Sequence, residues 1–196
     1  MTYLILILSF LCGSIPFGYL LVKKYKHQDI REVGSGNIGS TNVRRAAGKK
    51  ISILTQLLDM AKGMVPVFIT CLIFDYIDTI YTKQTLCLAS AFGAILGHDF
   101  SPFLKFKGGK GVNTTLGAFF LLAPIPVILT GFSFKLLKLL TPIVSVRSLI
   151  ICLLLPIFSF LLKFDLTVIY AQLAAAAIIF LRHIDNIKRL YHHTEN

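Results

Sequence analysis

Long apolar runs separated by short basic segments account for most of this 196-residue sequence. Most of these runs approach the ~20 apolar residues that a helix needs to cross the hydrocarbon core of a bilayer. The runs cover residues 2–22, 51–74, 84–97, 112–132, 147–162 and 166–181. Hydrophobic residues make up 55% of the chain and charged residues 15%, whereas an ordinary soluble domain is about 25% charged. The sequence therefore predicts an all-α integral membrane protein and excludes a soluble enzyme.

The distribution of lysine and arginine predicts the orientation in the membrane. Residues 23–50 carry eight of the 20 basic residues, residues 98–111 carry three, and the tail from residue 182 carries three. By the positive-inside rule all three segments face the cytoplasm, so the N-terminus is external and the number of crossings is odd. The run 2–22 has Lys23 and Lys24 behind it and no basic residue ahead of it, the reverse of a secretory signal, so we expect it to stay as the first span.

Two prolines bring the number of spans to an odd count. Pro124 and Pro126 interrupt a straight helix, so the region 112–145 is predicted to form two short spans, 112–123 and 126–144. The total becomes seven spans, with five as the alternative if part of this region lies in the membrane interface. We expect residues 1–196 to form a single transmembrane domain.

The net charge of +11 favours anionic lipids or phosphorylated small molecules as partners. Most Phe and Tyr residues lie inside the apolar runs rather than among the basic clusters, which argues against nucleic acid. The four cysteines show no spacing typical of a zinc site, and no metal is expected.

The first polar segment, residues 34–45, reads Gly-Ser-Gly-Asn-Ile-Gly-Ser-Thr-Asn-Val-Arg-Arg. Its letters match the dinucleotide fingerprint GxGxxG, but a helical span precedes it where that motif needs a strand. Glycines still let backbone N–H groups converge on an anion, and the Ser, Thr, Asn and Arg side chains add donors. We expect a phosphate site here, and a solvated basic loop that touches anionic headgroups is the alternative.

The second polar segment follows Gly97-His98 and reads Phe-Lys-Gly-Gly-Lys-Gly-Val over residues 106–112. It is not a Walker loop, because Leu104 and Gly111 stand where that motif needs Gly and Ser or Thr. Glycines flank Lys110 at the start of a span, where free N–H groups and the positive helix end favour an anion. The alternative is that these lysines only set the topology.

The third polar segment, residues 182–190, is expected to continue the last span into water as a helix. His183 and Asn186 are three apart, so a helix would turn them toward one side, where they could meet one ligand. An amphipathic tail with its arginines at the lipid headgroups is the alternative.

Asp59 and Lys62 lie three residues apart within the run 51–74. Charges at bilayer depth are costly and usually pair or line a cavity. We expect a structural ion pair, with support of the polar site as the alternative.

Taken together, these segments resemble the motifs of the bacterial acyl-phosphate:glycerol-3-phosphate acyltransferase family, over nearly the whole chain. The matching stretches are residues 13–18, 34–45, 57–63, 97–98, 106–112 and 182–190. The resemblance implies a small enzyme of the bacterial cytoplasmic membrane, with about seven helices and an active site on the cytoplasmic face. It would move an acyl group from acyl phosphate to the 1-hydroxyl of sn-glycerol 3-phosphate, giving lysophosphatidic acid and inorganic phosphate in the first step of phospholipid synthesis.

The resemblance also assigns roles to individual residues. Ser35, Arg45 and Lys110, with Gly108 and Gly109, match the residues that hold the phosphate of glycerol 3-phosphate. Ser145, His183 and Asn186 match those at the acyl phosphate and are the expected catalytic residues. Further substrate contacts are expected of Gly36, Asn37, Thr41, Asn42, His98, Lys107 and Gly111.

The chemistry of an acyl phosphate explains why a basic, glycine-rich set would suffice. An acyl phosphate is a mixed anhydride with a good leaving group, so the protein mainly has to align two anionic substrates and stabilise an oxyanion. No buried nucleophile or cofactor is required, and the enzyme that forms acyl phosphate is a further expected partner. The sequence departs from the usual family pattern at Pro102, Lys105, Asn113 and Arg147.

Two other functions fit part of this pattern. A transporter of a phosphorylated solute would also use basic pockets and broken helices. Polar residues are scarce on the predicted external half, however, and a permeation route needs them on both sides. An inactive, lipid-binding paralogue is the second alternative.

Overall fold

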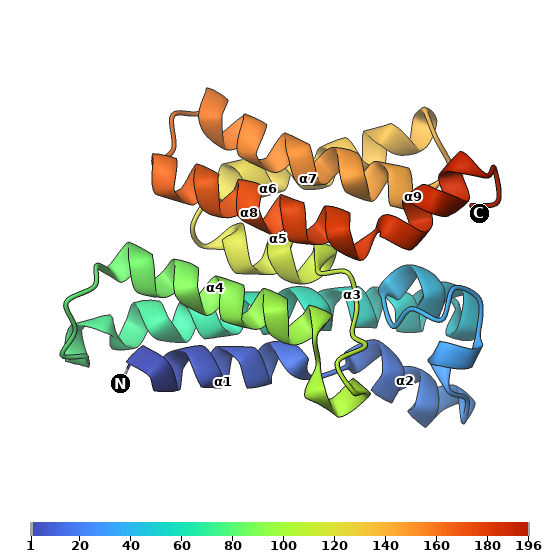
Figure 1. Cartoon of the computed structure of the whole chain (residues 1–196), viewed down its shortest axis with the longest axis horizontal. Helices are drawn as coiled ribbons and strands as arrows, with labels where there is room; N and C mark the ends of the chain where they lie inside the picture. Colours follow the sequence, from blue (N-terminus) through green and yellow to red (C-terminus); the bar gives the residue numbers. More distant parts are fainter. Residues whose placement is uncertain (1, 196) are drawn as a thin grey trace. The chain divides into compact units, whose positions relative to one another are not determined.

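The computed structural model describes residues 2–195, and within them the chain is helical and contains no strand (Figure 1). The α-helices are α1 (Thr2–Ser14), α2 (Phe17–Lys26), α3 (Ser40–Ile73), α4 (Lys83–Asp99), α5 (Val112–Phe120), α6 (Pro124–Leu136), α7 (Val144–Leu161), α8 (Leu166–Arg182) and α9 (Ile184–Tyr191). Short 3₁₀ turns lie between them: η1 (Ile30–Glu32), η2 (Phe74–Tyr76), η3 (Pro102–Leu104) and η4 (Leu137–Leu139). The expected all-α class is confirmed for the described residues.

The chain divides into two compact units, one ending at Leu121 and the other beginning at Leu122. The first unit contains α1 to α5, and the second contains α6 to α9. The boundary falls at the Pro-containing turn that the sequence predicted as a helix break, because α5 ends at Phe120 and α6 begins at Pro124.

Glycines allow the helices of the first unit to pack backbone against backbone. A Cβ atom at Gly97 of α4 would lie only 2.1 Å from the carbonyl oxygen of Phe10 in α1. A Cβ at Gly117 of α5 would lie 1.9 Å from the carbonyl oxygen of Met60 in α3. Close approach through small residues is how helices associate in lipid, where apolar surface alone supplies no driving force.

A buried chain of hydroxyl groups links three helices of the same unit. The hydroxyls of Ser9 in α1 and Ser90 in α4 lie 2.7 Å apart, and Thr70 of α3 donates to Ser90 at 3.0 Å. Each hydroxyl is almost completely buried. These hydrogen-bonded hydroxyl groups therefore fix the rotation of α1, α3 and α4 about their axes.

The second unit is built on antiparallel neighbours, with α7 in contact with both α6 and α8 (Figure 1). Arg147 near the start of α7 is buried against α6, where its guanidinium carbon lies 4.8 Å from the centre of the Phe134 ring. Its Nη2 donates to the carbonyl oxygen of Pro142 at 3.2 Å.

Three predicted segment boundaries differ from the structure. The run 2–22 is not one continuous helix, since it breaks between Ser14 and Phe17, where Pro16 has no N–H to donate. The polar segment 34–45 is a loop only to Gly39, an extended residue that caps the start of α3. The tail does not continue the last span as one helix: α8 ends at Arg182, and α9 is bent from it by 57°.

Three helical segments within residues 2–195 are long and apolar enough to cross a bilayer: Thr2–Lys26, Ser40–Tyr76 and Val144–Leu161. The bent pair α8 and α9 makes a fourth if it is counted as one span. The nine residues of α5 extend only about 14 Å, which is too short for a ~30 Å core. The seven-span count and the external N-terminus stay predictions.

Candidate active site

Asn42 organises the first glycine-rich loop from the first turn of α3. Its buried side-chain amide donates to the carbonyl oxygens of Val33 at 2.8 Å, Asn37 at 2.9 Å and Ile30 at 3.2 Å. Its Oδ1 accepts from the backbone N–H of Ser35 at 3.2 Å. These bonds commit Asn42 to shaping the loop, although the sequence pattern made it a candidate for direct contact with substrate.

Two glycines give this loop its curvature, because Gly34 and Gly36 have φ angles of 58° and 68°. The Cδ atom of Arg45 lies 3.6 Å from the point where a Cβ at Gly34 would stand, so the Arg45 side chain runs beside the loop. Thr41 lies in the first turn of α3, where backbone N–H groups lack intrahelical acceptors and the helix end favours an anion. The exposed residues Ser35, Thr41 and Arg45 thus surround one positively polarised helix start.

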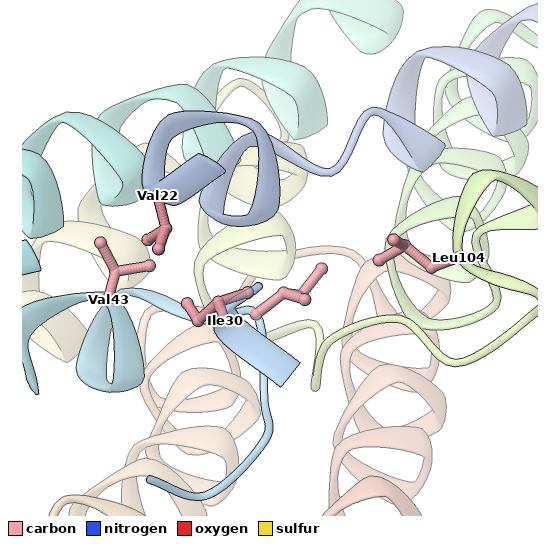
Figure 2. Close-up of a cluster of buried hydrophobic side chains, with 5 residues drawn as sticks. Val22, Ile30, Val43 and Leu104 are labelled. Carbon is pink, nitrogen blue, oxygen red and sulfur yellow. The ribbon is translucent and has the colours of Figure 1, made fainter. Parts of the chain in front are cut away.

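The structure brings the second glycine-rich segment against the first. Leu104, just before that segment, belongs to a buried cluster with Val22, Ile30, Ile38 and Val43 (Figure 2). At the other end of the segment, the amide of Asn113 donates to the hydroxyl of Ser40 at 3.3 Å. The two segments that the sequence predicted to bind phosphate are therefore neighbours within the first unit.

Gly108 and Gly109 lie directly on the end of α4. Their N–H groups donate to the carbonyl oxygens of Asp99 at 3.2 Å and His98 at 3.0 Å. A Cβ at Gly108 would lie 2.1 Å from the His98 carbonyl oxygen, and one at Gly109 would lie 2.0 Å from the His98 Nε2 atom. These two glycines therefore permit a close approach to His98. Their N–H groups donate to backbone carbonyl oxygens of the protein.

The Asp99 carboxylate lies at the start of α5. Its two oxygens are 3.1 and 3.2 Å from the position of a Cβ at Gly111, the residue that caps α5 with a φ angle of 74°. Asp99 is completely buried. The positive end of α5, which the sequence offered as a place for a substrate anion, thus has a carboxylate of the protein beside it, and Lys110 is the half-buried cation of the segment.

His183 marks the junction of α8 and α9 in the second unit. Its Nδ1 lies 2.8 Å from the carbonyl oxygen of Ile179. A carbonyl oxygen only accepts, so Nδ1 carries a hydrogen in this contact. The ring is buried, with 3% of the residue exposed.

The carboxylate of Glu195 gathers the remaining polar groups of the second unit. The side-chain amide of Asn186 donates to it, and Nε of Arg189 donates to its Oε2 at 2.6 Å. Burial raises the pKa of the Glu195 carboxyl, but these two hydrogen bonds and the nearby Ser145 hydroxyl outweigh burial and hold the pKa below its ordinary value of 4.5. Ser145 of α7 and Asn186 of α9 therefore meet at one anion.

The predicted site residues fall into two groups, one in each unit. The first unit holds Ser35, Gly36, Asn37, Thr41, Asn42, Arg45, His98, Lys107, Gly108, Gly109, Lys110 and Gly111. The second holds Ser145, His183 and Asn186. Within the first group, Asn42 and His98 are buried beneath the loops, whereas Lys107, just before Gly108, is exposed.

Sequence reasoning missed two acidic residues at these groups. Asp99 directly follows His98, and an acid next to a basic glycine-rich loop was a signal that could have been used. Glu195 is the last acid of the chain, and its spacing from Asn186 shows no periodicity that would link them, because the chain turns back at His193, whose φ angle is 55°.

These features define an integral membrane protein with a basic, glycine-rich site suited to phosphorylated ligands. The family model described as glycerol-3-phosphate acyltransferase matches residues 3–193. The chain therefore belongs to the glycerol-3-phosphate acyltransferase family, and the family resemblance stated from its motifs is confirmed.

Individual relatives match over nearly their whole length. The glycerol-3-phosphate acyltransferase of Clostridium acetobutylicum is 46% identical over 187 residues, covering 95% of this chain and 94% of the relative. That of Endomicrobium trichonymphae is 40% identical over 193 residues, covering 98% of this chain and 94% of the relative.

Two crystal structures of PlsY (YgiH), an integral membrane glycerol 3-phosphate acyltransferase, share this fold. The glycerol 3-phosphate form superposes with a TM-score of 0.89 at 34% identity, and the lysophosphatidic acid form with a TM-score of 0.87 at 33% identity. Each comparison covers 100% of this chain and 94% of the solved chain.

Proposed function

We propose that this protein transfers an acyl group from acyl phosphate to the 1-hydroxyl of sn-glycerol 3-phosphate, producing lysophosphatidic acid and inorganic phosphate. The observation that carries the proposal is the junction of the two glycine-rich segments, tied by Asn113 and Ser40 in the first unit of a family member. The related structures were solved with glycerol 3-phosphate and in a lysophosphatidic acid form, which supports the acceptor and the product.

The first unit binds glycerol 3-phosphate in this proposal. Ser35, Arg45 and Lys110 hold the phosphate, with the start of α3 adding its positive end. Asn42 and His98 shape the two loops from below. Lys107 and Thr41 lie at the exposed rim, where they attract the dianionic substrate.

The second unit receives the acyl phosphate. Ser145 lies in α7, His183 at the junction of α8 and α9, and Asn186 in α9. The side-chain amide of Asn186 already donates to the Glu195 carboxylate. This supports a preference of the group for an anion. Donors fixed in a largely apolar site stabilise a developing oxyanion at no cost in reorganisation.

The reaction needs no covalent enzyme intermediate. The 1-hydroxyl oxygen attacks the acyl carbonyl carbon, an ester bond forms, and the carbon–oxygen bond to phosphate breaks. The proton of the hydroxyl goes to a base, for which Nε2 of His183 and the phosphate oxygens of the substrates are the two candidates. Phosphate leaves with the bonding electron pair.

The lysine and arginine distribution supports a site on the cytoplasmic face, and membership of the family supports the bacterial cytoplasmic membrane as the location. We assign the chain an odd number of spans, an external N-terminus and a single acyltransferase domain that contains both units. The enzyme that forms acyl phosphate would supply the donor from the same compartment.

The decisive experiment measures phosphate release by purified protein with acyl phosphate and glycerol 3-phosphate. Formation of lysophosphatidic acid, which is common to all three donors, is expected with acyl phosphate and not with acyl-CoA or acyl-acyl carrier protein, which would release a thiol instead of phosphate. Arg45→Ala and Lys110→Ala are expected to abolish it, while Lys163→Ala, which changes an exposed cation in the turn before α8, should not. Normal turnover in both site variants would refute the assignment of the phosphate site.

A further inference from the structure

A charged pair lies inside the longest helix of the first unit. Nζ of Lys62 is 2.9 Å from Oδ1 of Asp59, and only 3% and 2% of these residues are exposed. Their pairing confirms the ion pair expected from the sequence. A buried ion pair is weak evidence for stability, because desolvation of both charges offsets much of their attraction. The pair also has a neighbour on each side, the Ile15 carbonyl oxygen and the His98 ring.

On one side, Lys62 binds the break between α1 and α2. Its Nζ donates at 2.7 Å to the carbonyl oxygen of Ile15, 47 residues earlier in the sequence. The hydroxyl of Ser101 donates at 2.6 Å to the neighbouring carbonyl oxygen of Ser14. Since Pro16 interrupts the helix there, these two buried side chains satisfy carbonyl oxygens exposed by the break.

On the other side, Asp59 faces His98. Its Oδ1 lies 3.8 Å from Nδ1 of the His98 ring. The opposite ring nitrogen, Nε2, lies against Gly109, where a Cβ would be only 2.0 Å away. The backbone of the same histidine accepts the Gly109 N–H at 3.0 Å. The imidazole thus lies between the carboxylate, which is within ion-pair range but beyond hydrogen-bond distance, and the glycine-rich segment that ends in Lys110.

We infer that Asp59 and Lys62 are positioning residues for glycerol 3-phosphate, which hold the His98 ring against Gly109 so that the Gly108–Lys110 segment keeps its binding conformation. The pair is anchored at the Ile15 carbonyl oxygen and reaches the substrate loop only through His98. Neither residue touches the substrate. This inference rests on the proposed function, because it assigns the pair to the acceptor side of that reaction.

Positioning and simple charge balance predict different kinetics. If the two charges only neutralise one another, replacing both by apolar residues of similar size removes the pair without changing substrate affinity. If the pair positions His98, the same double replacement loosens the glycine-rich segment and weakens glycerol 3-phosphate binding. The KM for the acyl donor should be unaffected, because the residues proposed to bind it, Ser145, His183 and Asn186, belong to the second unit.

The test compares wild-type protein with the Asp59→Leu/Lys62→Met double variant. We expect KM for glycerol 3-phosphate, and its Kd by calorimetry, to rise at least about tenfold, with KM for acyl phosphate within about twofold of wild type. Thr70→Val is the matched control: it removes a buried polar contact from the same helix and should lower thermal stability without changing either KM.

A second variant tests the positioning role of Asp59 if the double variant does not fold. Asp59→Glu keeps both charges but moves the carboxylate by one methylene group, so positioning predicts a raised KM and Kd for glycerol 3-phosphate. Wild-type values of KM and Kd in a folded variant of either kind would overturn the inference.

The outcome for wild-type protein separates this inference from the proposed function. Wild type that binds glycerol 3-phosphate but releases no phosphate from acyl phosphate would refute the proposed reaction, while the Kd comparison would still decide the role of the pair. Wild type that does not bind glycerol 3-phosphate would overturn both.

Discussion

The side-chain amide of Asn113 donates a hydrogen bond to the hydroxyl of Ser40 at 3.3 Å, across 73 residues of sequence. The bond joins the first turn of α5 to the first turn of α3. Both turns follow a glycine-rich segment, so this hydrogen bond helps to fix the position of one candidate phosphate-binding segment relative to the other.

Removing the hydrogen bond between Asn113 and Ser40 should weaken the binding of glycerol 3-phosphate. A neutral hydrogen bond contributes about 1 kcal/mol, which corresponds to about a fivefold change in affinity. We therefore expect Asn113→Ala to raise KM for glycerol 3-phosphate by about that factor, with kcat unchanged, in steady-state phosphate-release assays. Ser133→Ala is a suitable control, because that hydroxyl only bonds a carbonyl oxygen of its own helix. An unchanged KM in Asn113→Ala would show that this hydrogen bond does not fix the relative position of the two glycine-rich segments.

Adding a methyl group at Gly109 should disable the second segment. The new Cβ would stand 2.0 Å from Nε2 of buried His98, so the loop has to move away and carry Lys110 with it. A displacement of about 1 Å at a reacting site costs on the order of 100-fold, and we expect at least that loss in kcat/KM for Gly109→Ala. Gly131→Ala on α6 meets no atom within 4 Å and should retain wild-type activity. Comparable activity in the two variants would contradict the packing argument.

The contact between α3 and α5 should be sensitive to the same change at Gly117. A Cβ there would lie 1.9 Å from the carbonyl oxygen of Met60, which belongs to the backbone of α3 and cannot rotate away. Overpacking of this kind costs about 1–3 kcal/mol, so Gly117→Ala should lower the thermal midpoint measured by circular dichroism in detergent. Gly131→Ala again serves as the control and should leave the midpoint unchanged or slightly higher. A wild-type midpoint in Gly117→Ala would mean that α5 can move away from α3.

The tail carboxylate predicts a pH dependence of stability. The pKa of Glu195 in the folded chain lies below its ordinary value of 4.5, so the ionised form stabilises the folded state above that pH. This contribution is lost as the pH falls through the lowered pKa. Wild type should therefore melt at a higher temperature than Glu195→Gln near neutral pH, and the difference should shrink below pH 4.5.

A control at another carboxylate distinguishes the stabilisation by ionised Glu195 from the effect of changing the net charge of the protein. Glu32 in η1 is exposed, and Glu32→Gln should reduce the thermal midpoint little at any pH. A constant difference between wild type and Glu195→Gln from neutral to acidic pH would refute the role of the ionised tail carboxylate.

Features encoded over consecutive residues were predictable from the sequence. The apolar runs identify helices and a membrane environment, because hydropathy sums over neighbouring positions. Pro124 and Pro126 located the break between α5 and α6, since proline disrupts a helix by its own covalent structure. The pairing of Asp59 with Lys62 followed from their spacing of three residues on one helix.

Relationships across long stretches of chain were decided by tertiary structure. Lys62 bonds Ile15 across 47 residues and Ser101 bonds Ser14 across 87, and no local pattern encodes either contact. The placement of Asp99 beside Gly111, and of Glu195 on Asn186, likewise depends on how the chain turns back on itself. The sequence by itself determined the membrane class, the helix break before Pro124 and the family motifs. Only the packing of helices at glycine contacts decided which polar groups are exposed at the loops and which are buried beneath them.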